Sequence, residues 1–148
     1  MRVIITGSSG LIGTSLGLRL MADGIEVAGI DRLPNPWTDR IPTRLEDLCT
    51  TGSLDPAPWG QADVVVHLAA RAKVHESVEH PSNALENYTV THRALDYCRQ
   101  TGTPVIFGSS REVYGEQASV PVREDAVRLH RPLCVRLPTG EHWYSSPV

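Results

Sequence analysis

The first thirteen residues constrain the fold of this chain most strongly. A short apolar run at 2–5 leads into Thr-Gly-Ser-Ser-Gly-Leu-Ile-Gly, and apolar residues at helical spacing follow at once. A strand, a glycine turn and a helix in this order form the pyrophosphate-binding turn of dinucleotide-binding proteins. Gly7 would permit the tight turn, and Gly10 would let the main chain approach a phosphate. Gly13 would let the helix lie close to the strand, so that the helix N-terminus faces the phosphates.

An acidic residue stands at the expected distance from this turn. Residues 25–30 read as a second strand, and Asp31 follows at its carboxyl end. A carboxylate there bonds the adenosine ribose and repels a 2′-phosphate, which favours NAD over NADP. The adjacent Arg32 weakens this inference, because arginine can hold that phosphate. The alternative is that Asp31 caps the turn before Leu33-Pro34.

Two further segments predict parallel strands. Residues 62–68 form an unbroken, largely β-branched run that is typical of a central strand covered on both faces, and small residues follow it. We interpret His67, inside this run, as a core residue. Pro104 opens a short strand that delivers two serines at its carboxyl end, the edge at which open α/β sheets bind ligands.

The coarse element order is that of a doubly wound α/β protein. Strands are expected at 2–6, 25–30, 43–46, 62–68 and from 104 onward, with helices at 11–23 and 82–101. Gly102 follows the second helix as its expected C-cap. A short turn of helix is expected at 76–81. The pattern predicts a Rossmann-like parallel sheet.

The ordered set of motifs resembles the extended short-chain dehydrogenase/reductases. It includes the glycine turn, Asp31, Asp-Val-Val-Val-His-Leu-Ala-Ala at 63–70, Asn87, and Ser-Ser-x-x-Val-Tyr-Gly at 109–115. The most similar branch is the NAD-dependent epimerase/dehydratase family, to which UDP-glucose 4-epimerase belongs. The resemblance covers residues 1 to about 126. It implies an NAD(P)-binding domain, NAD as a recycled cofactor and a nucleotide sugar as substrate.

The resemblance also implies a role for individual residues. Asp47 and Leu48 match the adenine contact, Ser109 the nicotinamide side, and Ser110 the hydroxyl that bonds the reacting sugar oxygen. Glu112 falls where some dehydratase-like members carry an acid. The implied catalytic residue is Ser110, and the implied cofactor-binding residues are Gly7, Gly10, Leu11, Ile12, Gly13, Asp31, Arg32, Asp47, Leu48, Leu68, Ala69, Ala70, Asn87 and Ser109.

The chain departs from the family at the catalytic base. In the family, a tyrosine takes a proton from the sugar hydroxyl, and a lysine four residues later lowers the pKa of that tyrosine. The chain has one lysine, Lys73. The positions four residues after its tyrosines hold His92, Thr101, Ala118 and Val148, so Tyr-x-x-x-Lys is absent. We therefore expect a partial or inactive member.

The composition changes near residue 127. Residues 1–126 read as a partial Rossmann domain, whereas 127–148 form a divergent tail that is rich in arginine and proline. We expect the substrate domain of the family and the last part of the sheet to be missing. Our hypothesis is that the reading frame changed near this point, or that the gene encodes a truncated relative.

The charge, the cysteines and histidines, and the hydropathy of the chain limit its possible partners and location. A net charge of −3 argues against non-specific nucleic-acid binding. Three scattered cysteines and six histidines show no metal-ligand spacing, so we expect no metal, and reduced thiols fit the cytoplasm. We expect neither a signal peptide nor a membrane-spanning segment, because no apolar stretch approaches 18 residues. The resemblance leaves a homodimer open.

Three functions are consistent with these patterns. The leading one is an NAD-dependent nucleotide-sugar epimerase or dehydratase. The second is a non-catalytic NAD-binding regulatory module, since related folds can keep the glycine turn after losing catalysis. The third is another extended reductase, with a steroid, flavonoid or aldehyde substrate.

Overall fold

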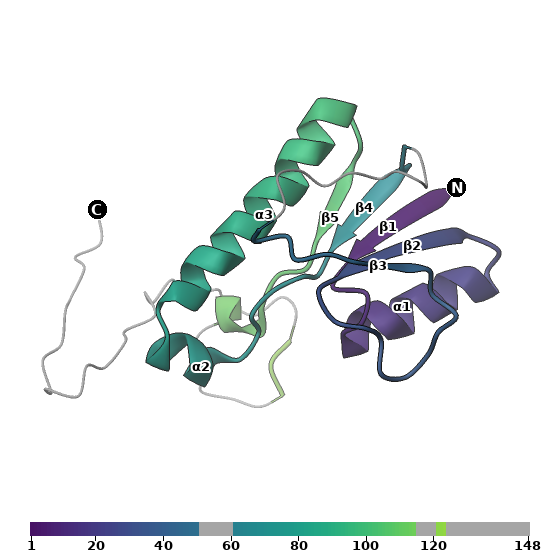
Figure 1. Ribbon diagram of the computed structural model, residues 1–148. Coiled ribbons are helices and arrows are strands. Elements are labelled where there is room, and N and C mark those ends of the chain that lie inside the picture. The colour runs from purple at the N-terminus through teal and green to yellow at the C-terminus, as the bar shows by residue number, and fades with distance from the viewer. Residues whose placement is uncertain (51–60, 115–120, 124–148) are drawn as a thin grey trace, which may run out of the picture. The chain divides into compact units, whose positions relative to one another are not determined.

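The chain divides into two compact units, Met1–Gly108 and Ser109–Val148. Figure 1 shows a computed structural model, in which residues 1–50, 61–114 and 121–123 are described. In the second unit the described secondary structure is a short 3₁₀ helix, η1 (Arg111–Tyr114). The predicted tail at 127–148 lies outside the described residues.

A five-stranded parallel sheet forms the first unit. Its strands are β1 (Arg2–Thr6), β2 (Glu26–Asp31), β3 (Thr43–Leu45), β4 (Val64–His67) and β5 (Val105–Phe107). All four strand pairs are parallel, and the spatial order is β3-β2-β1-β4-β5. This is the strand order of a Rossmann-like doubly wound sheet, in which ligands bind at the carboxyl edge, at the switch point between β1 and β4. The predicted fold class is confirmed.

Helices cover both faces of this sheet (Figure 1). Helix α1 (Leu11–Ala22) lies on one face, and α3 (Ser82–Thr101) lies on the other, preceded by the short α2 (Val74–Glu79). The alternation of side chains along β1 builds the two cores. Val3 and Ile5 belong to the cluster against which Leu16 and Leu20 of α1 pack, whereas Ile4 belongs to the cluster that includes Val90 of α3.

The expected element bounds are close to the observed ones. Helix α3 has the predicted limits, and Gly102 caps it with a φ of +70°, as expected of a left-handed C-cap. Strand β4 is shorter than the run at 62–68 predicted. The short helix α2 begins two residues earlier than the turn expected at 76–81.

Strand β5 carries apolar residues that the described part of the first unit leaves uncovered. Ile106 and Phe107 are 58% and 54% exposed, although the equivalent residues of β4 are buried. Because β5 is the edge strand of the described sheet, its free main-chain groups and apolar side chains favour pairing with further structure.

Candidate cofactor site

The turn after β1 has the geometry that its glycines predict. Gly7 has a φ of +75°, and a Cβ atom there would lie 2.8 Å from the main-chain nitrogen of Ala69. A Cβ atom on Gly13 would overlap the carbonyl oxygen of Gly7 and lie 2.9 Å from the Cα of Ser8. Gly7 is therefore needed for the bend, and Gly13 for the close approach of α1 to the turn.

The third glycine stands in more open space. A Cβ atom on Gly10 would meet only the carbonyl oxygen of Gly7, at 3.3 Å. Gly10 is the N-cap of α1 and provides no side-chain hydrogen bond, and the first turn of the helix holds no acid. The side chains of Leu11 and Ile12 are 70% and 69% exposed. The positive end of the helix is thus uncapped by any side chain and accessible, as an anion site requires.

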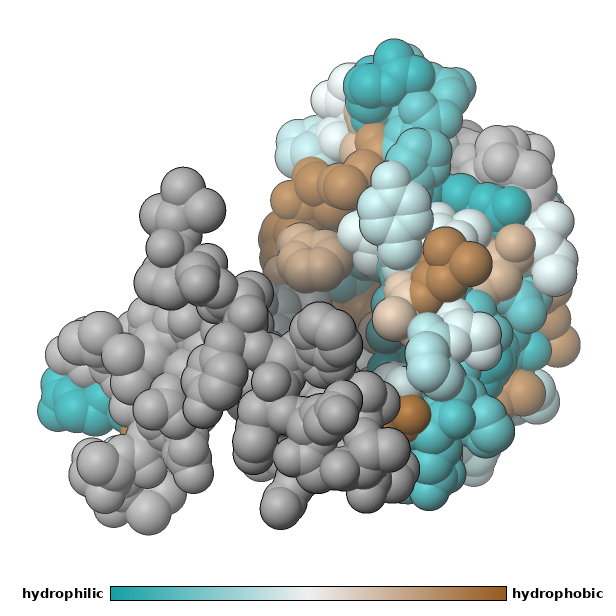
Figure 2. Space-filling view, turned by 90° about the vertical axis from the view of Figure 1, so that its left-hand side faces the viewer, coloured by the Kyte–Doolittle hydropathy of each residue, from teal (hydrophilic) through white to brown (hydrophobic). Residues whose placement is uncertain are grey.

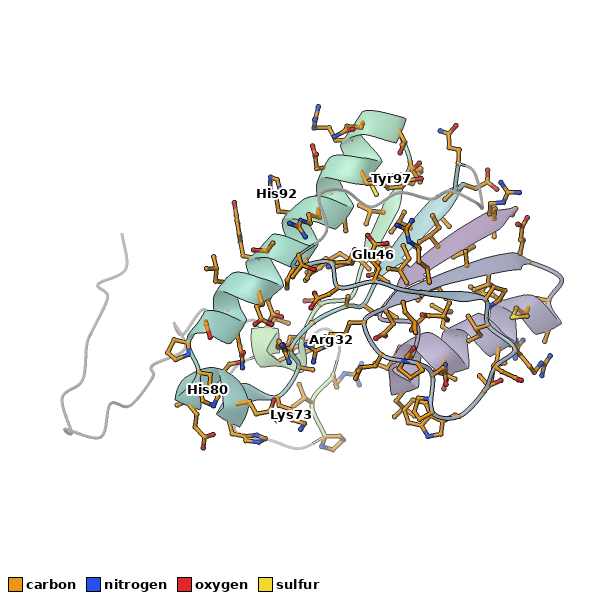
Figure 3. All side chains as sticks on the ribbon, in the orientation of Figure 1. Arg32, Glu46, Lys73, His80, His92 and Tyr97 are labelled. Carbon is orange, nitrogen blue, oxygen red and sulfur yellow. The ribbon has the colours of Figure 1, made fainter. Side chains whose placement is uncertain are left out.

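Asp31, the last residue of β2, is tied to the glycine turn. Its Oδ2 accepts a hydrogen bond from the main-chain N–H of Ser9 at 3.0 Å, and its Oδ1 accepts one from Leu33 at 3.0 Å. The second bond is the turn cap that was the alternative interpretation. Each carboxylate oxygen retains a lone pair, so the cap and a bond to a ribose hydroxyl are compatible. Arg32 lies exposed beside it (Figure 3).

Asn35 is a residue of this site that sequence reasoning missed. Its Nδ2 donates to Thr14 Oγ1 at 2.8 Å and to the Ser8 carbonyl at 3.3 Å. Its Oδ1 accepts from the main-chain N–H groups of Trp37 and Thr38, at 2.9 and 3.2 Å. Asn35 therefore fastens the loop after β2 to the glycine turn. The available signal was an asparagine between two prolines, which is typical of an Asx turn.

Asn87 holds the loop after β4. Its Oδ1 accepts the main-chain N–H of Arg71 at 2.6 Å, and its Nδ2 donates to the Arg71 carbonyl at 3.2 Å. The Arg71 Nε also donates to Glu86 Oε2 at 2.6 Å, which raises the pKa of the guanidinium. Helix α3 thus anchors the chain just after Ala69 and Ala70. The predicted contact of Asn87 with a cofactor stays a prediction.

The predicted adenine contact follows β3. The Oδ1 of Asp47 accepts the N–H of Cys49 at 2.8 Å, and the carbonyl of Leu48 accepts a hydrogen bond from Arg93 of α3. The side chain of Leu48 is 4% exposed and belongs to the core on the α3 face. A ligand contact by Leu48 would therefore use its main chain, and the contact itself stays a prediction.

Ser109 and Ser110 belong to the second unit. Both residues are exposed, and the Ser110 carbonyl accepts the N–H of Val113 at 3.1 Å at the start of η1. Their predicted contacts with the nicotinamide and the sugar stay predictions. The glycine turn, Asp31, Asp47 and the loop after β4 all lie in the first unit.

No cluster of metal ligands occurs among the described residues. Cys49 and Cys98 are free thiols, and burial is the main cause that raises the pKa of each. Cys134 lies outside the described residues. Within the described ranges, no helix is long and apolar enough to cross a membrane.

The parallel sheet and its glycine turn define a Rossmann-like α/β protein. The model of the NAD dependent epimerase/dehydratase family matches residues 3–133. The chain belongs to this family.

Relatives and solved structures agree with this membership. The chain is 34% identical over 132 residues to a UDP-glucose 4-epimerase of Azospirillum brasilense. The match covers 84% of this chain and 38% of the relative. The UDP-glucose 4-epimerase of Thermus thermophilus in complex with NAD is similar with a TM-score of 0.69 at 30% identity, over 84% of this chain and 43% of that one. An NAD-dependent NDP-hexosamine 5,6-dehydratase involved in tunicamycin biosynthesis has a TM-score of 0.68 at 30% identity. That match covers 84% of this chain and 42% of the dehydratase. The chain thus spans about two fifths of these proteins.

Proposed function

We propose that this chain is the NAD-binding part of a nucleotide-sugar epimerase or dehydratase. The observation that carries the proposal is the glycine turn. Gly7 is backed by the main chain of Ala69, Gly13 packs against Gly7, and the turn opens an uncapped α1. Main-chain N–H groups and a helix dipole without competing side chains fit a pyrophosphate. The implied cofactor residues listed above are part of this proposal.

Isothermal titration of the purified chain with NAD tests the proposal. We expect one site per chain, and we expect adenosine alone to bind more weakly because it lacks the pyrophosphate. A chain that is folded by circular dichroism and releases no heat with NAD would refute the proposal.

The choice of NAD over NADP is part of the same proposal and has its own test. Asp31→Asn removes a charge that would repel a 2′-phosphate and turns one acceptor into a donor facing an N–H group. We expect NAD affinity to fall by roughly tenfold, since a hydrogen bond to a charged group contributes about 1.5–3 kcal/mol. We expect NADP affinity to rise relative to NAD.

Asp39→Asn is the matched control for this change. Asp39 is exposed in the loop after β2, so its substitution removes the same charge without altering the turn. We therefore expect Asp31→Asn to change the affinities for NAD and NADP, and Asp39→Asn to leave both unchanged. Equal NAD affinity of Asp31→Asn and Asp39→Asn would rule out the ribose role.

The substrate is proposed to be a nucleotide sugar, held in part by Ser110, with Ser109 on the nicotinamide side. The supporting observations are the family membership and the Ser-Ser-x-x-Val-Tyr-Gly segment at 109–115.

We also propose that the protein works in the cytoplasm. The free thiols of Cys49 and Cys98 would suit that reducing compartment.

A non-catalytic NAD-binding module is the second candidate. The absence of Tyr-x-x-x-Lys favours it, because no tyrosine of the chain is followed four residues later by the lysine that activates it in the family. This candidate predicts tight NAD binding together with a lack of turnover on any nucleotide sugar. Turnover by this chain would exclude it.

We also propose that α3 pairs with a second copy of the chain. Leu85, Tyr88, His92 and Leu95 follow one another at spacings of three and four residues, which is the pattern of a helix–helix seam. All four side chains are exposed, with Leu85 67% and Tyr88 68% exposed, and the Tyr88 and His92 rings stack at 6.1 Å. Figure 2 shows apolar surface beside polar surface on this side of the molecule.

Light scattering after gel filtration tests the pairing. We expect the mass of a dimer, and we expect the double change of Leu85 and Tyr88 to glutamate to give a monomer by placing charges in the seam. Leu45→Glu is the control, because Leu45 is 60% exposed on β3. A wild-type chain that is monomeric at micromolar concentration would contradict the pairing.

A further inference from the structure

Two buried polar side chains meet at the carboxyl ends of the central strands β1 and β4. Thr6 is 0% exposed and His67 is 2% exposed. The Thr6 Oγ1 lies 2.7 Å from His67 Nδ1, and the His67 Nε2 lies 3.3 Å from the Oγ1 of Thr91 on α3. We call these three side chains the threonine–histidine chain. Both ring nitrogens of His67 are thus partnered, as expected of a core histidine.

The same threonine hydroxyl also holds the start of the loop after β4. The main-chain N–H groups of Leu68 and Ala69 both donate to Thr6 Oγ1, at 3.3 Å. The N–H of Leu68 is shared with the Thr6 carbonyl at 3.0 Å. The hydroxyl oxygen is therefore an acceptor for this loop, and its own proton is available for another partner.

This arrangement selects one tautomer of His67. If Nδ1 carried the proton, Thr6 Oγ1 would face donors from His67, Leu68 and Ala69 with only two lone pairs, and its own proton would lack an acceptor. With the proton on Nε2, the Thr6 hydroxyl donates to Nδ1, and Nε2–H donates to Thr91. Each group then has a partner of the right kind.

The held segment forms one wall of the candidate site. The Ala69 nitrogen is the atom that a Cβ on Gly7 would approach to 2.8 Å, so this main chain lies directly against the glycine turn. We propose that His67 is a positioning residue of the cofactor site: as the Nε2–H tautomer it orients the Thr6 hydroxyl, which fixes the main chain of Leu68 and Ala69 against Gly7. The inference rests on the proposed function.

The surroundings of His67 favour its neutral form. Thr6 faces it from β1, Thr91 from α3, and the Phe107 ring of β5 stacks on it at 5.8 Å between centroids. Burial lowers the pKa of His67, and no charged group contributes to this shift. At neutral pH the imidazole is therefore uncharged. Protonation would place an Nδ1–H against Thr6 and reverse the hydrogen bond between them.

The test compares two substitutions of His67 in the full chain. His67→Leu removes both ring nitrogens, whereas the amide oxygen of His67→Asn can replace Nδ1 as an acceptor for Thr6. Amide exchange of Ala69 is measured by NMR in the free chain, and NAD affinity is measured by titration from pH 5 to 8. His80→Asn is the control, because His80 is exposed at the end of α2 (Figure 3).

We expect the Ala69 amide to exchange about tenfold faster in His67→Leu and NAD to bind about tenfold more weakly, since a buried hydroxyl loses its acceptor. His67→Asn should keep both the Ala69 exchange rate and the NAD affinity near those of the wild type. In the wild type, NAD affinity should fall as the pH drops through the lowered pKa of His67, and it should stay flat in His67→Asn. The free energy of unfolding should also fall below about pH 6.5, because the unfolded state takes up the proton first.

Two results would overturn the proposal: an Nδ1–H tautomer in the ¹⁵N spectrum of the wild type, or unchanged Ala69 exchange in His67→Leu. If His67→Leu does not fold, Thr6→Val and Thr6→Ser provide the same comparison, and equal Ala69 exchange in these two would overturn it. If the wild type binds no NAD, the proposed function fails, and exchange in the free chain still decides the role of His67.

Discussion

Gly13→Ala is expected to weaken NAD binding by about 10- to 100-fold and to destabilise the chain. The new methyl group would overlap the carbonyl oxygen of Gly7 and crowd the Cα of Ser8, both of which are main-chain atoms. Main chain cannot rotate away as a side chain does, so α1 must move off the turn. Overpacking of this kind costs about 1–3 kcal/mol, and every 1.4 kcal/mol is a factor of ten in affinity.

Gly24→Ala is the control that distinguishes a loss of NAD affinity from a loss of stability. Gly24 follows α1 with a φ of +77°, and nothing lies within 4 Å of a Cβ atom placed there. This variant should lose about 1–2 kcal/mol of stability through backbone strain. It should nevertheless bind NAD like the wild type. If Gly13→Ala also kept wild-type NAD affinity, the glycine turn would not be the pyrophosphate site.

The main elements of this fold could be predicted from local sequence patterns. The β-branched runs of β1 and β4 place side chains on both faces, and each run ends in small or polar residues at one edge. Gly7 and Gly102 have the positive φ values that their positions indicated. These features depend on a few neighbouring residues, so periodicity and turn chemistry are enough to find them.

The contacts that shape the candidate site could not be predicted in this way. Asn35 bonds Thr14 of α1, and Asn87 of α3 bonds the main chain of Arg71, over separations of 21 and 16 residues in the sequence. Such a bond depends on where a loop and a helix come together, which no local pattern describes. Leu48 shows the same limit, because its burial is decided by the position of α3.

The edge strand β5 carries exposed apolar residues, as expected of an incomplete sheet. Ile106 and Phe107 stand exposed on the last described strand, and the chain spans 38% of the length of the Azospirillum relative. An edge of this kind favours pairing with further structure.

The chain alone is expected to show no epimerase or dehydratase turnover. A positioned general base contributes about 10²- to 10⁴-fold in rate, and a phenol with a pKa near 10 needs a nearby cation to serve at neutral pH. Tyr114 has alanine four residues later, so no lysine stands in the position that would activate it. The sole lysine, Lys73, directly precedes α2 (Figure 3). Its Nζ forms an ion pair with Glu76 Oε1 of that helix at 2.7 Å.

Mixing the chain with NAD and UDP-glucose tests this expectation directly. Neither UDP-galactose nor a transient NADH signal should form, whereas the Azospirillum relative should produce the epimer under the same conditions. A chimera that joins residues 1–108 to the carboxyl-terminal part of that relative provides the matched comparison. Turnover by the chimera, together with no turnover by the chain alone, would place the defect after residue 108, the part in which the tyrosine and lysine of the family are expected. Turnover by the chain alone would require that another of its groups takes the proton from the sugar, and the expectation would be wrong.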